Sequence, residues 1–463
     1  MTRKIFLVLT TYFLLLTAFS ALIVEVNAQK KPTDKAKKLA KQADQFFQQK
    51  DYRNAVNKYA EAILISPNFP EAHFRKGEAH NYLKEYDLSI ADLNLALEQG
   101  YKPNQEIYKL RWSMHYEKKD YDSALKDVQG ALKIEPANNI LNLGLANIYR
   151  SQGLYEDAAR VYKKVAEAEP NNPDVHYFMA LSYFKVGDFK AQELAASGAV
   201  KRNTQFLGES YYLLGDALQK GKKYDEAIQA YQQAIKVKPD IFEIYNNLSE
   251  IYRSQSRYDE AIAMAKKGLD LSPNNGNLYV NLSRDYSLTD RNDEAIAAAQ
   301  NAIKLLPNQS AAYTNLCRAY NDTKQYQKAV DACNDALRIN PNDGETNYYI
   351  GRAYDLLKKP DIATEHYKKA VIGLVEYTRI NPEYSDGFYL LGNAHYANNQ
   401  RDKAVEAYKK SLQLSPNFAK ARYNLGYIYF LNKDMNSARE QYDALLKIDK
   451  DLAEKLKQAI EKK

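Results

Sequence analysis

A spacing of 34 residues recurs without insertion between Phe242 and Asp343, and it strongly limits what this chain can fold into. Three successive blocks share one order of aromatic, small and proline residues. They read Tyr245, Ser249, Tyr252, Ala261, Gly268, Pro273, then Tyr279, Ser283, Tyr286, Ala295, Ala302, Pro307, then Tyr313, Cys317, Tyr320, Ala329, Ala336, Pro341. A period of this length predicts small units that pack on their neighbours, so that the core grows along the chain.

The same order of residues extends well beyond this stretch. An Ala, an aromatic residue, a second Ala and a Pro end many units, and full copies stand at Ala55, Tyr59, Ala62, Pro67 and at Ala227, Tyr231, Ala234, Pro239. We expect two short helices in each unit, with proline ending the second helix and stacking supplying the stability that short helices lack alone. Twelve units are expected, beginning near residues 36, 70, 105, 139, 173, 208, 242, 276, 310, 344, 385 and 419.

Small residues recur at one place in the first helix of the units. They are Ala43, Gly77, Ala146, Ala180, Gly215, Gly351, Gly392 and Gly426. A helix without a bulky side chain can approach its partner closely, so we expect the paired helices to be nearest at these residues.

This combination of period, aromatic and small residues, and closing Pro-Asn resembles the tetratricopeptide repeat (TPR) family over nearly all of residues 36–450. The resemblance implies an all-α fold, a right-handed superhelical solenoid of about twelve helix-turn-helix repeats. Beyond the repeats, Leu452, Leu456 and Ile460 are spaced along one helical face. We therefore expect residues 451–463 to form a helix that caps the last repeat.

One unit is longer than the others. Pro341 and Pro382 are 41 residues apart, seven more than the period, and the surplus lies between Val371 and Asn381. Seven residues are about two helical turns, so they can extend the second helix without rotating its apolar face. Two interpretations stand side by side, a docking feature for a partner and a tolerated insertion.

The N-terminus predicts export. Residues 1–28 contain Arg3 and Lys4, an apolar run from Ile5 to Val24, and small residues at the Val26-x-Ala28 spacing, which is typical of a signal peptide cut after Ala28. A basic linker, residues 29–35, follows. Export would place the repeats in the periplasm or cell envelope. The apolar run is also long enough to span a bilayer, so an inner-membrane anchor is the alternative.

Charge argues against nucleic-acid binding. The chain carries a formal net charge of +7, and its first 50 residues account for six of these charges. The remaining chain is nearly neutral and lacks the basic stripe of a nucleic-acid-binding protein.

No catalytic constellation stands outside the repeat pattern. Five of the six histidines occupy aromatic places of the repeat, which leaves only His366 off the pattern. The string from Gly215 to Lys222 has one residue too many between its glycines for a phosphate-binding loop. The sequence therefore predicts no enzyme activity, no metal and no cofactor.

The two cysteines, Cys317 and Cys333, lie on the two predicted helices of the ninth unit. They align with small residues of the preceding units, so two small core residues are one interpretation. In an exported chain these places could also face each other and form a disulfide.

The strongest binding candidates lie in units seven to ten. The resemblance implies that first helices line a concave groove, and here they carry a row of asparagines and a row of arginines. The rows are Asn247, Asn281 and Asn315, and Arg253, Arg284, Arg318 and Arg352. Such rows offer donors to an extended peptide and positive charge to acidic side chains. Local pairing of the arginines with Glu250, Asp322 or Asp355 is the alternative.

Tyrosines mark the inner places of later units. Tyr348, Tyr389 and Tyr423 predict an aromatic patch that suits a peptide, although stacking on sugars or packing between units would also explain them.

These observations predict a non-catalytic, exported scaffold that binds a protein or peptide in its concave groove, with an acidic partner as one option, and they resemble repeat regions of bacterial envelope proteins. Membrane contact is expected only through an uncleaved N-terminal segment. The alternatives are an anchored regulator facing the cytoplasm, and a carbohydrate-handling protein or enzyme accessory subunit of the envelope.

Overall fold

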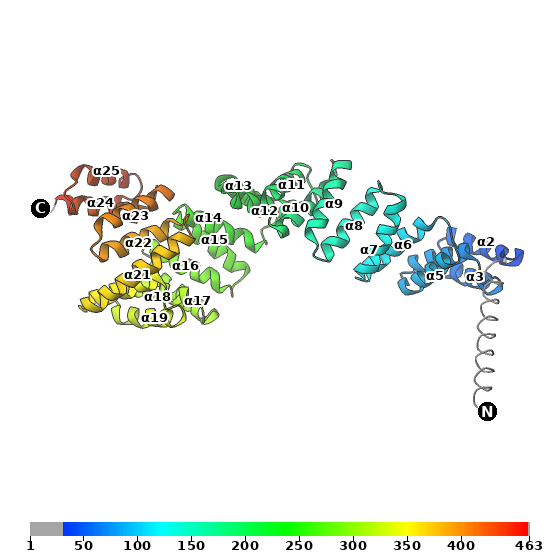
Figure 1. Ribbon diagram of the computed structural model, residues 1–463, viewed down its shortest axis with the longest axis horizontal. Helices are drawn as coiled ribbons and strands as arrows, with labels where there is room; N and C mark the ends of the chain where they lie inside the picture. The colour runs from blue at the N-terminus through cyan, green and yellow to red at the C-terminus, as the bar shows by residue number, and fades with distance from the viewer. Residues whose placement is uncertain (1–30, 462–463) are drawn as a thin grey trace, which may run out of the picture. The chain divides into compact units, whose positions relative to one another are not determined.

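The computed structural model describes residues 31–461, which form 25 helices and no strands (Figure 1). Twelve antiparallel helix pairs follow one another, and each begins within two residues of the predicted start. The all-α prediction is therefore confirmed. The predicted signal segment, residues 1–28, lies outside the described residues. None of the described helices is long and apolar enough to cross a membrane.

The chain divides into two compact bodies. The N-terminal body extends to Phe206 and the C-terminal body begins at Leu207. The first contains α2 (Asp34–Gln48), α3 (Tyr52–Ile65), α4 (Pro70–Tyr82), α5 (Tyr86–Glu98), α6 (Asn104–Glu117), α7 (Tyr121–Ile134), α8 (Asn139–Ser151), α9 (Tyr155–Ala168), α10 (Pro173–Val186) and α11 (Phe189–Lys201).

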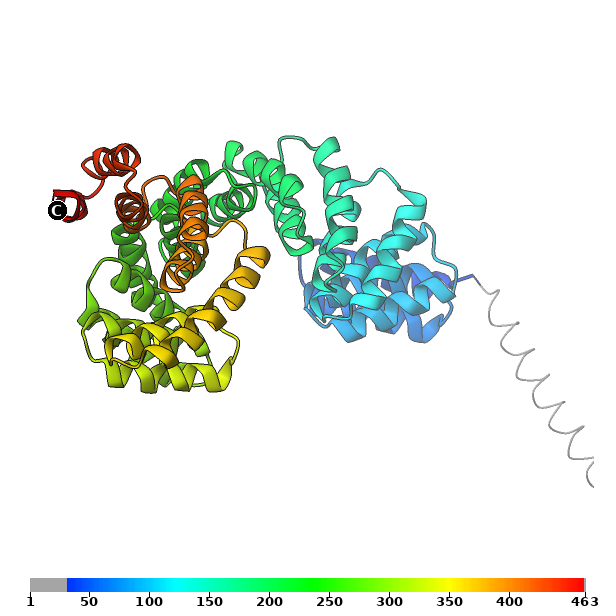
Figure 2. The same cartoon turned by 60° about the vertical axis from the view of Figure 1, so that its left-hand side comes forward.

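The C-terminal body contains the repeats with the predicted binding rows. Its helices are α12 (Leu207–Lys220), α13 (Tyr224–Val237), α14 (Phe242–Ser254), α15 (Tyr258–Leu271), α16 (Gly276–Leu288), α17 (Asn292–Leu305), α18 (Ser310–Asp322), α19 (Tyr326–Ile339), α20 (Gly344–Leu356), α21 (Pro360–Ile380), α22 (Ser385–Ala397), α23 (Arg401–Leu414), α24 (Ala419–Leu431), α25 (Met435–Leu445) and α26 (Lys450–Glu461). Figure 2 shows the orange helices α22–α24 beside the green helices α14–α16.

The paired helices approach closely where the sequence places a small residue. A Cβ atom added at Gly392 would lie 2.6 Å from Cε1 of Tyr408, and one added at Gly351 would lie 2.9 Å from the ring of Tyr367. Tyr408 itself is buried. The ring of the second helix therefore occupies the space that a side chain on the first helix would need, which confirms the predicted role of these glycines.

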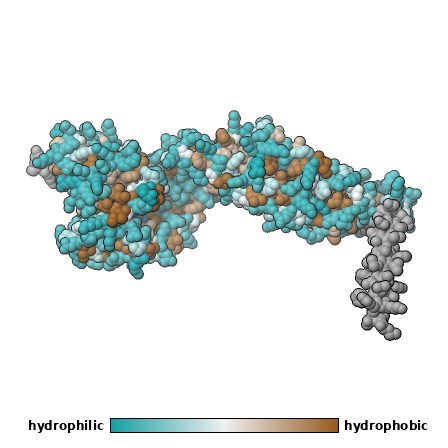
Figure 3. Space-filling model, in the orientation of Figure 1, coloured by the Kyte–Doolittle hydropathy of each residue, from teal (hydrophilic) through white to brown (hydrophobic). Residues whose placement is uncertain are grey.

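Helix α21 has 21 residues, against 14 in α19, which confirms the predicted extension of the second helix. The extension packs tightly on the start of α20, where a Cβ at Gly373 would meet the Cα of Gly344 at 2.7 Å. Its outer side is apolar and exposed, with 72% of Ile372 and 61% of Ile380 accessible. In Figure 3 hydrophobic residues gather over the region of α21 and α22.

The last helix, α26, covers the end of the array. Its residues Ala453 and Leu456 are buried against Leu445 of α25. A Cβ at Gly426 would meet Leu456 at 2.7 Å, so α26 also packs closely on α24.

A left-handed residue joins the two helices of every repeat. Ten of these twelve turns use a residue other than glycine, and lysine is the commonest. The lysines are Lys50, Lys84, Lys119, Lys222, Lys324, Lys358 and Lys433. A side chain with a Cβ is strained in this conformation, by roughly 1–2 kcal/mol.

Replacing Lys324, which is exposed and has φ of 62°, with glycine should therefore stabilise the protein by about 0.5–1 kcal/mol, because glycine adopts this backbone without strain. Urea unfolding followed by circular dichroism measures the change. Gln300→Gly, at an exposed place inside α17, is the control and should destabilise by about 1 kcal/mol. Equal destabilisation by both changes would contradict the explanation.

Gly392→Ala should destabilise the C-terminal body by about 1–3 kcal/mol, because the added methyl group overlaps the buried ring of Tyr408. Gly221→Ala is the matched control, since its Cβ would make only ordinary contacts at 3.4 Å. Thermal unfolding of both variants tests this. A Gly392→Ala protein as stable as Gly221→Ala would show that the helices separate easily.

Candidate functional site

The predicted groove residues of the C-terminal body lie around a set of contacts between distant repeats. One side comes from the seventh and eighth repeats and the other from the eleventh and twelfth. We call this set the clasp, and its residues are Ser256, Tyr258, Arg284, Leu288 and Asp290 on one side and Asp386, Ser415, Phe418 and Lys420 on the other.

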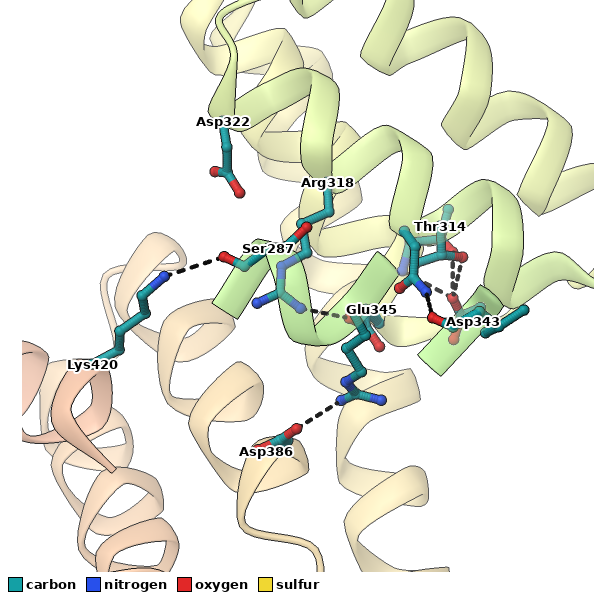
Figure 4. Close-up of polar contacts among 12 residues, drawn as sticks. Ser287, Thr314, Arg318, Asp322, Asp343, Glu345, Asp386 and Lys420 are labelled. Atoms are coloured by element: carbon teal, nitrogen blue, oxygen red, sulfur yellow. Dashed lines mark hydrogen bonds and ion pairs between the residues drawn. The ribbon is translucent and has the colours of Figure 1, made fainter. Parts of the chain in front are cut away.

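Polar contacts hold the two sides of the clasp together. Lys420 Nζ lies 2.9 Å from Asp290 Oδ1. It also donates to the carbonyl oxygen of Ser287 at 3.3 Å, as Figure 4 shows. The hydroxyl oxygens of Ser256 and Ser415 are 2.7 Å apart. These pairs join residues 130–159 positions apart in the sequence, whereas a solenoid repeat ordinarily contacts only its neighbours.

An apolar seam lies beside the polar contacts. Leu288 packs in one cluster with Phe418 and Leu425, and Tyr258 faces Phe418 with a ring distance of 6.3 Å. The Tyr258 hydroxyl lies 3.5 Å from Asp386 Oδ1. Burial, followed by the nearby Asp386 carboxylate, raises the pKa of the Tyr258 hydroxyl well above its ordinary value, so it stays a neutral donor.

Two cavities flank the clasp. The first, the tyrosine cavity, has a volume of about 630 Å³. Seven tyrosines line it, namely Tyr348, Tyr349, Tyr367, Tyr389, Tyr396, Tyr408 and Tyr427, together with three basic residues, Arg318, Arg352 and Lys420, and three acidic ones, Asp290, Asp322 and Asp355. The second, the extension cavity, has a volume of about 800 Å³ and lies beside the end of α21. Arg253, Asn281, Arg284, Tyr377 and Tyr384 are among the residues that line it.

Six of the seven tyrosine hydroxyls in this cavity, including those of Tyr348, Tyr389 and Tyr396, have no hydrogen-bond partner among residues 31–461. The seventh, the Tyr408 hydroxyl, donates to Asn393 at 2.6 Å. Burial raises the pKa of Tyr348 to about 12, so its hydroxyl is protonated at neutral pH. The cavity therefore presents neutral donors and aromatic faces together.

The arginine row is paired with carboxylates of the same chain. Arg253 donates two hydrogen bonds to Asp285, at 2.7 and 3.0 Å. Arg352 donates to Asp322 at 2.8 Å, the one pairing that matches a local partner considered from the sequence. Both of these guanidinium groups are thus held by hydrogen bonds.

The two middle arginines face carboxylates without hydrogen bonds, and Arg318 also lies over the ring of Tyr349, 5.6 Å from its centroid. Arg284 approaches Asp386 at 3.3 Å and Arg318 approaches Glu345 at 3.9 Å, and neither guanidinium donates a hydrogen bond to another described residue (Figure 4). The Arg318 side chain is only 7% exposed. Burial alone would lower the pKa of Arg284, but Glu345 and Asp386 outweigh it and raise that pKa, so the charge persists.

The asparagine row is less uniform than the sequence suggests. Asn247 donates to the Tyr231 hydroxyl and Asn315 to the carbonyl oxygen of Val280, each at 2.8 Å. Asn281 lines the extension cavity. Tyr423 stacks on Tyr427 near the terminal helix and does not line either cavity.

Cys317 of α18 and Cys333 of α19 form a disulfide, with their Cα atoms 5.2 Å apart. Both residues are fully buried between the paired helices. Among the described residues, no group of three or more His, Cys, Asp or Glu side chains could hold a metal ion.

The clasp was not predicted from the sequence, although one signal for it was available. The turn between paired helices carries lysine in seven repeats and Gly153, Gly187 or Asn399 in three others, and only in the seventh and eighth do successive repeats carry other polar residues, Ser256 and Asp290. These two turns are the ones that contact Ser415 and Lys420.

Models of known families match long parts of both bodies. Those described as "Tetratricopeptide repeat" match residues 115–191, 212–276, 252–318, 310–343 and 419–452. One described as "TPR repeat" matches residues 43–82 and 392–433.

Curated relatives are similar over part of their length. The Hsp70-Hsp90 organising protein of Plasmodium falciparum is 27% identical over 166 residues, which are 35% of this chain and 28% of that protein. The human Superkiller complex protein 3 is 23% identical over 45% of this chain and 14% of its own length. The human Protein O-mannosyl-transferase TMTC1 is 28% identical over 38% of this chain and 20% of its own length.

Among solved structures, the match to yeast Tom70 covers 93% of this chain and 95% of the Tom70 chain, with 17% identity and a TM-score of 0.39. The match to the MamA protein is 27% identical and covers 39% of this chain and 94% of the MamA chain, with a TM-score of 0.26. The twelve helix pairs and the repeat models that match along both bodies together show that this chain belongs to the tetratricopeptide repeat family.

Proposed function

We propose that the protein is a non-catalytic scaffold that binds an extended peptide or protein segment in the concave groove of its C-terminal body. The observation that carries this proposal is the tyrosine cavity, where unpaired hydroxyls of Tyr348 and Tyr389 lie near the buried guanidinium of Arg318. The guanidinium only donates hydrogen bonds and each hydroxyl can donate one, so these groups suit a ligand rich in carbonyl or carboxylate oxygens.

The size of the cavity agrees with a peptide ligand. Binding pockets commonly have volumes of about 300–1,000 Å³, and the tyrosine cavity, at about 630 Å³, lies in this range. Tyrosine is enriched at protein interfaces because one ring supplies both apolar area and a polar tip. A peptide backbone, with alternating carbonyl oxygens and side chains, can use both.

The charges around the arginine row determine which chemical groups a partner should carry. Each arginine of the row already faces a carboxylate of this chain, so an acidic ligand must compete with Glu345 and Asp386. Because Arg284 and Arg318 make no hydrogen bond with those carboxylates, their donors are available to a ligand without loss of an existing bond. We therefore propose partners with an acidic or carboxyl-terminal group placed at these two arginines.

One relative supports a protein-binding role for this chain. The Hsp70-Hsp90 organising protein is named for organising two other proteins, Hsp70 and Hsp90. This chain spans less than a third of the length of that relative. The match to a mannosyl-transferase covers 20% of that protein, so it gives no support for a transferase activity here.

Peptide binding can be tested by panning a random 12-mer phage library on residues 29–463 and measuring the enriched peptides by fluorescence anisotropy. Tyr348→Phe and Tyr389→Phe, which remove only the hydroxyls, should each weaken binding about three- to tenfold, the loss expected for one hydrogen bond. Tyr82→Phe, at an exposed tyrosine of the N-terminal body, is the control and should not change affinity.

If the library yields no peptide, or if all three variants bind equally well, peptide binding in this cavity is wrong. Enrichment of peptides that bind the N-terminal body alone would also rule out the proposed groove. Salt titration separates the two contributions, because an ionic contact with Arg318 weakens with salt and a tyrosine hydrogen bond does so much less.

We also propose export, supported by the signal-like residues 1–28 and by the position of the cysteines. Cys317 and Cys333 form a buried disulfide, and disulfides persist mainly in oxidising compartments.

Expression of the full chain in a bacterial host should yield a periplasmic protein that begins at Gln29. Its two cysteines should resist alkylation until the protein is unfolded and reduced. N-terminal sequencing and mass spectrometry before and after reduction make both measurements. A membrane-bound protein that retains Met1, or two thiols that react once the protein is unfolded without reductant, would contradict export.

A further inference from the structure

We infer that the clasp is a gate that divides one continuous groove into two cavities, and that a peptide enters the groove only when the clasp opens. This inference concerns the regulation of the groove and rests on the proposed peptide binding. It explains why the predicted arginine row does not lie along one open surface.

The clasp separates the arginine row into two pairs, one in each cavity. Arg253 and Arg284, from the seventh and eighth repeats, line the extension cavity. Arg318 and Arg352, from the ninth and tenth repeats, line the tyrosine cavity. The first helices of the eighth, ninth and tenth repeats lie side by side, and Arg253 of the seventh repeat bonds to Asp285 of the eighth, so the four arginines follow one helical surface.

Both cavities use clasp residues as part of their walls. Asp386, which pairs with Arg284, lines the extension cavity. Asp290 and Lys420, which pair with each other, both line the tyrosine cavity. Separating the two sides of the clasp would therefore open both cavities at once and join them across Arg284 and Arg318.

The clasp combines a mostly buried pair, Arg284 with Asp386, with polar contacts at its rim that can open without unfolding. Asp290 is 74% exposed in its pair with Lys420, and exposed ion pairs are weak, about 0–1 kcal/mol, and are screened by salt. In the apolar seam only Leu288 and Tyr258 come from the seventh and eighth repeats, and each helix pair keeps its own core when they part from Phe418. Small rotations at successive repeat interfaces add up along a solenoid, so a modest change at each interface separates the two sides.

The sequence of the turns supports a dedicated contact. Lysine at the places of Ser256 and Asp290, as in seven other repeats, would remove the hydrogen bond to Ser415 and set a cation against Lys420. Ser256 and Asp290, the two polar residues other than lysine that stand at the turns of successive repeats, are thus compatible with closure, whereas the common turn residue is not.

The first test measures the distance across the clasp. Spin labels at Asp293→Cys and Asn417→Cys, both exposed and on opposite sides, report this distance by double electron–electron resonance. The native cysteines are bonded to each other and do not take the label. We expect a short and a long distance, with the long population growing at 1 M salt and in Lys420→Glu.

The exchanged pair Asp290→Lys with Lys420→Asp should restore the short distance, because it keeps the attraction while reversing the charges. Circular dichroism should show unchanged helix content in every variant. One short distance that neither salt nor Lys420→Glu alters would overturn the gate and show a permanently closed body.

The second test locks the clasp. The hydroxyl oxygens of Ser256 and Ser415 are 2.7 Å apart, so Ser256→Cys with Ser415→Cys places two thiols within reach of a disulfide. The probes are the enriched 12-mer peptides. Oxidation should reduce their affinity at least tenfold, and mild reduction should restore it. The wild-type protein, treated with the same oxidant and reductant, controls for effects on the native disulfide.

The outcomes separate this inference from the proposed function. If the oxidised double variant binds the peptides as tightly as the wild type, the gate is wrong and groove binding stands. If no variant and no wild-type protein binds any peptide, peptide binding fails and the gate fails with it.

Discussion

The fold depends on one contact repeated across the helix pairs, between a residue of the first helix and the residue 16 positions later in the second. In several repeats the contact joins a glycine to a tyrosine ring, as in Gly392 with Tyr408. In the ninth repeat the same places hold the Cys317–Cys333 disulfide, also 16 residues apart. A ring, a pair of small side chains and a covalent bond are thus three solutions to one steric requirement. Close helix packing leaves room for only one bulky group at this point.

This contact acts within a repeat, and stacking acts between adjacent repeats, so neither of them predicts the clasp. The clasp joins the seventh and eighth repeats to the eleventh and twelfth, and all its residues except Arg284 come from turns and helix ends. The curvature of the C-terminal body brings these ends together. Polar and apolar contacts then form between parts of the chain that a strictly one-dimensional array would keep apart.

The difference explains which features the sequence predicts. Periodicity determined the helix pairs, the close approach at Gly351 and Gly392 and the two extra turns of α21, because each depends on residues near one another in the chain. The partners of Arg284 and Arg318 depend on the path of the backbone through several repeats, and no spacing rule supplies that path. The asparagine row shows the same limit, since Asn247 and Asn315 follow the period but bond to different kinds of acceptor.

The clasp also changes how the C-terminal body folds. In an open array, any terminal repeat can unfold while the others remain, because it shares only one interface. Here the repeats from the seventh to the twelfth lie within a loop closed by contacts more than 100 residues apart. Forming those contacts requires the intervening repeats to be in place, which raises the contact order and slows folding. The loss of any one of them removes the clasp, so these repeats should unfold more cooperatively while the clasp is closed, and they should return to the gradual unfolding of a linear array when it opens.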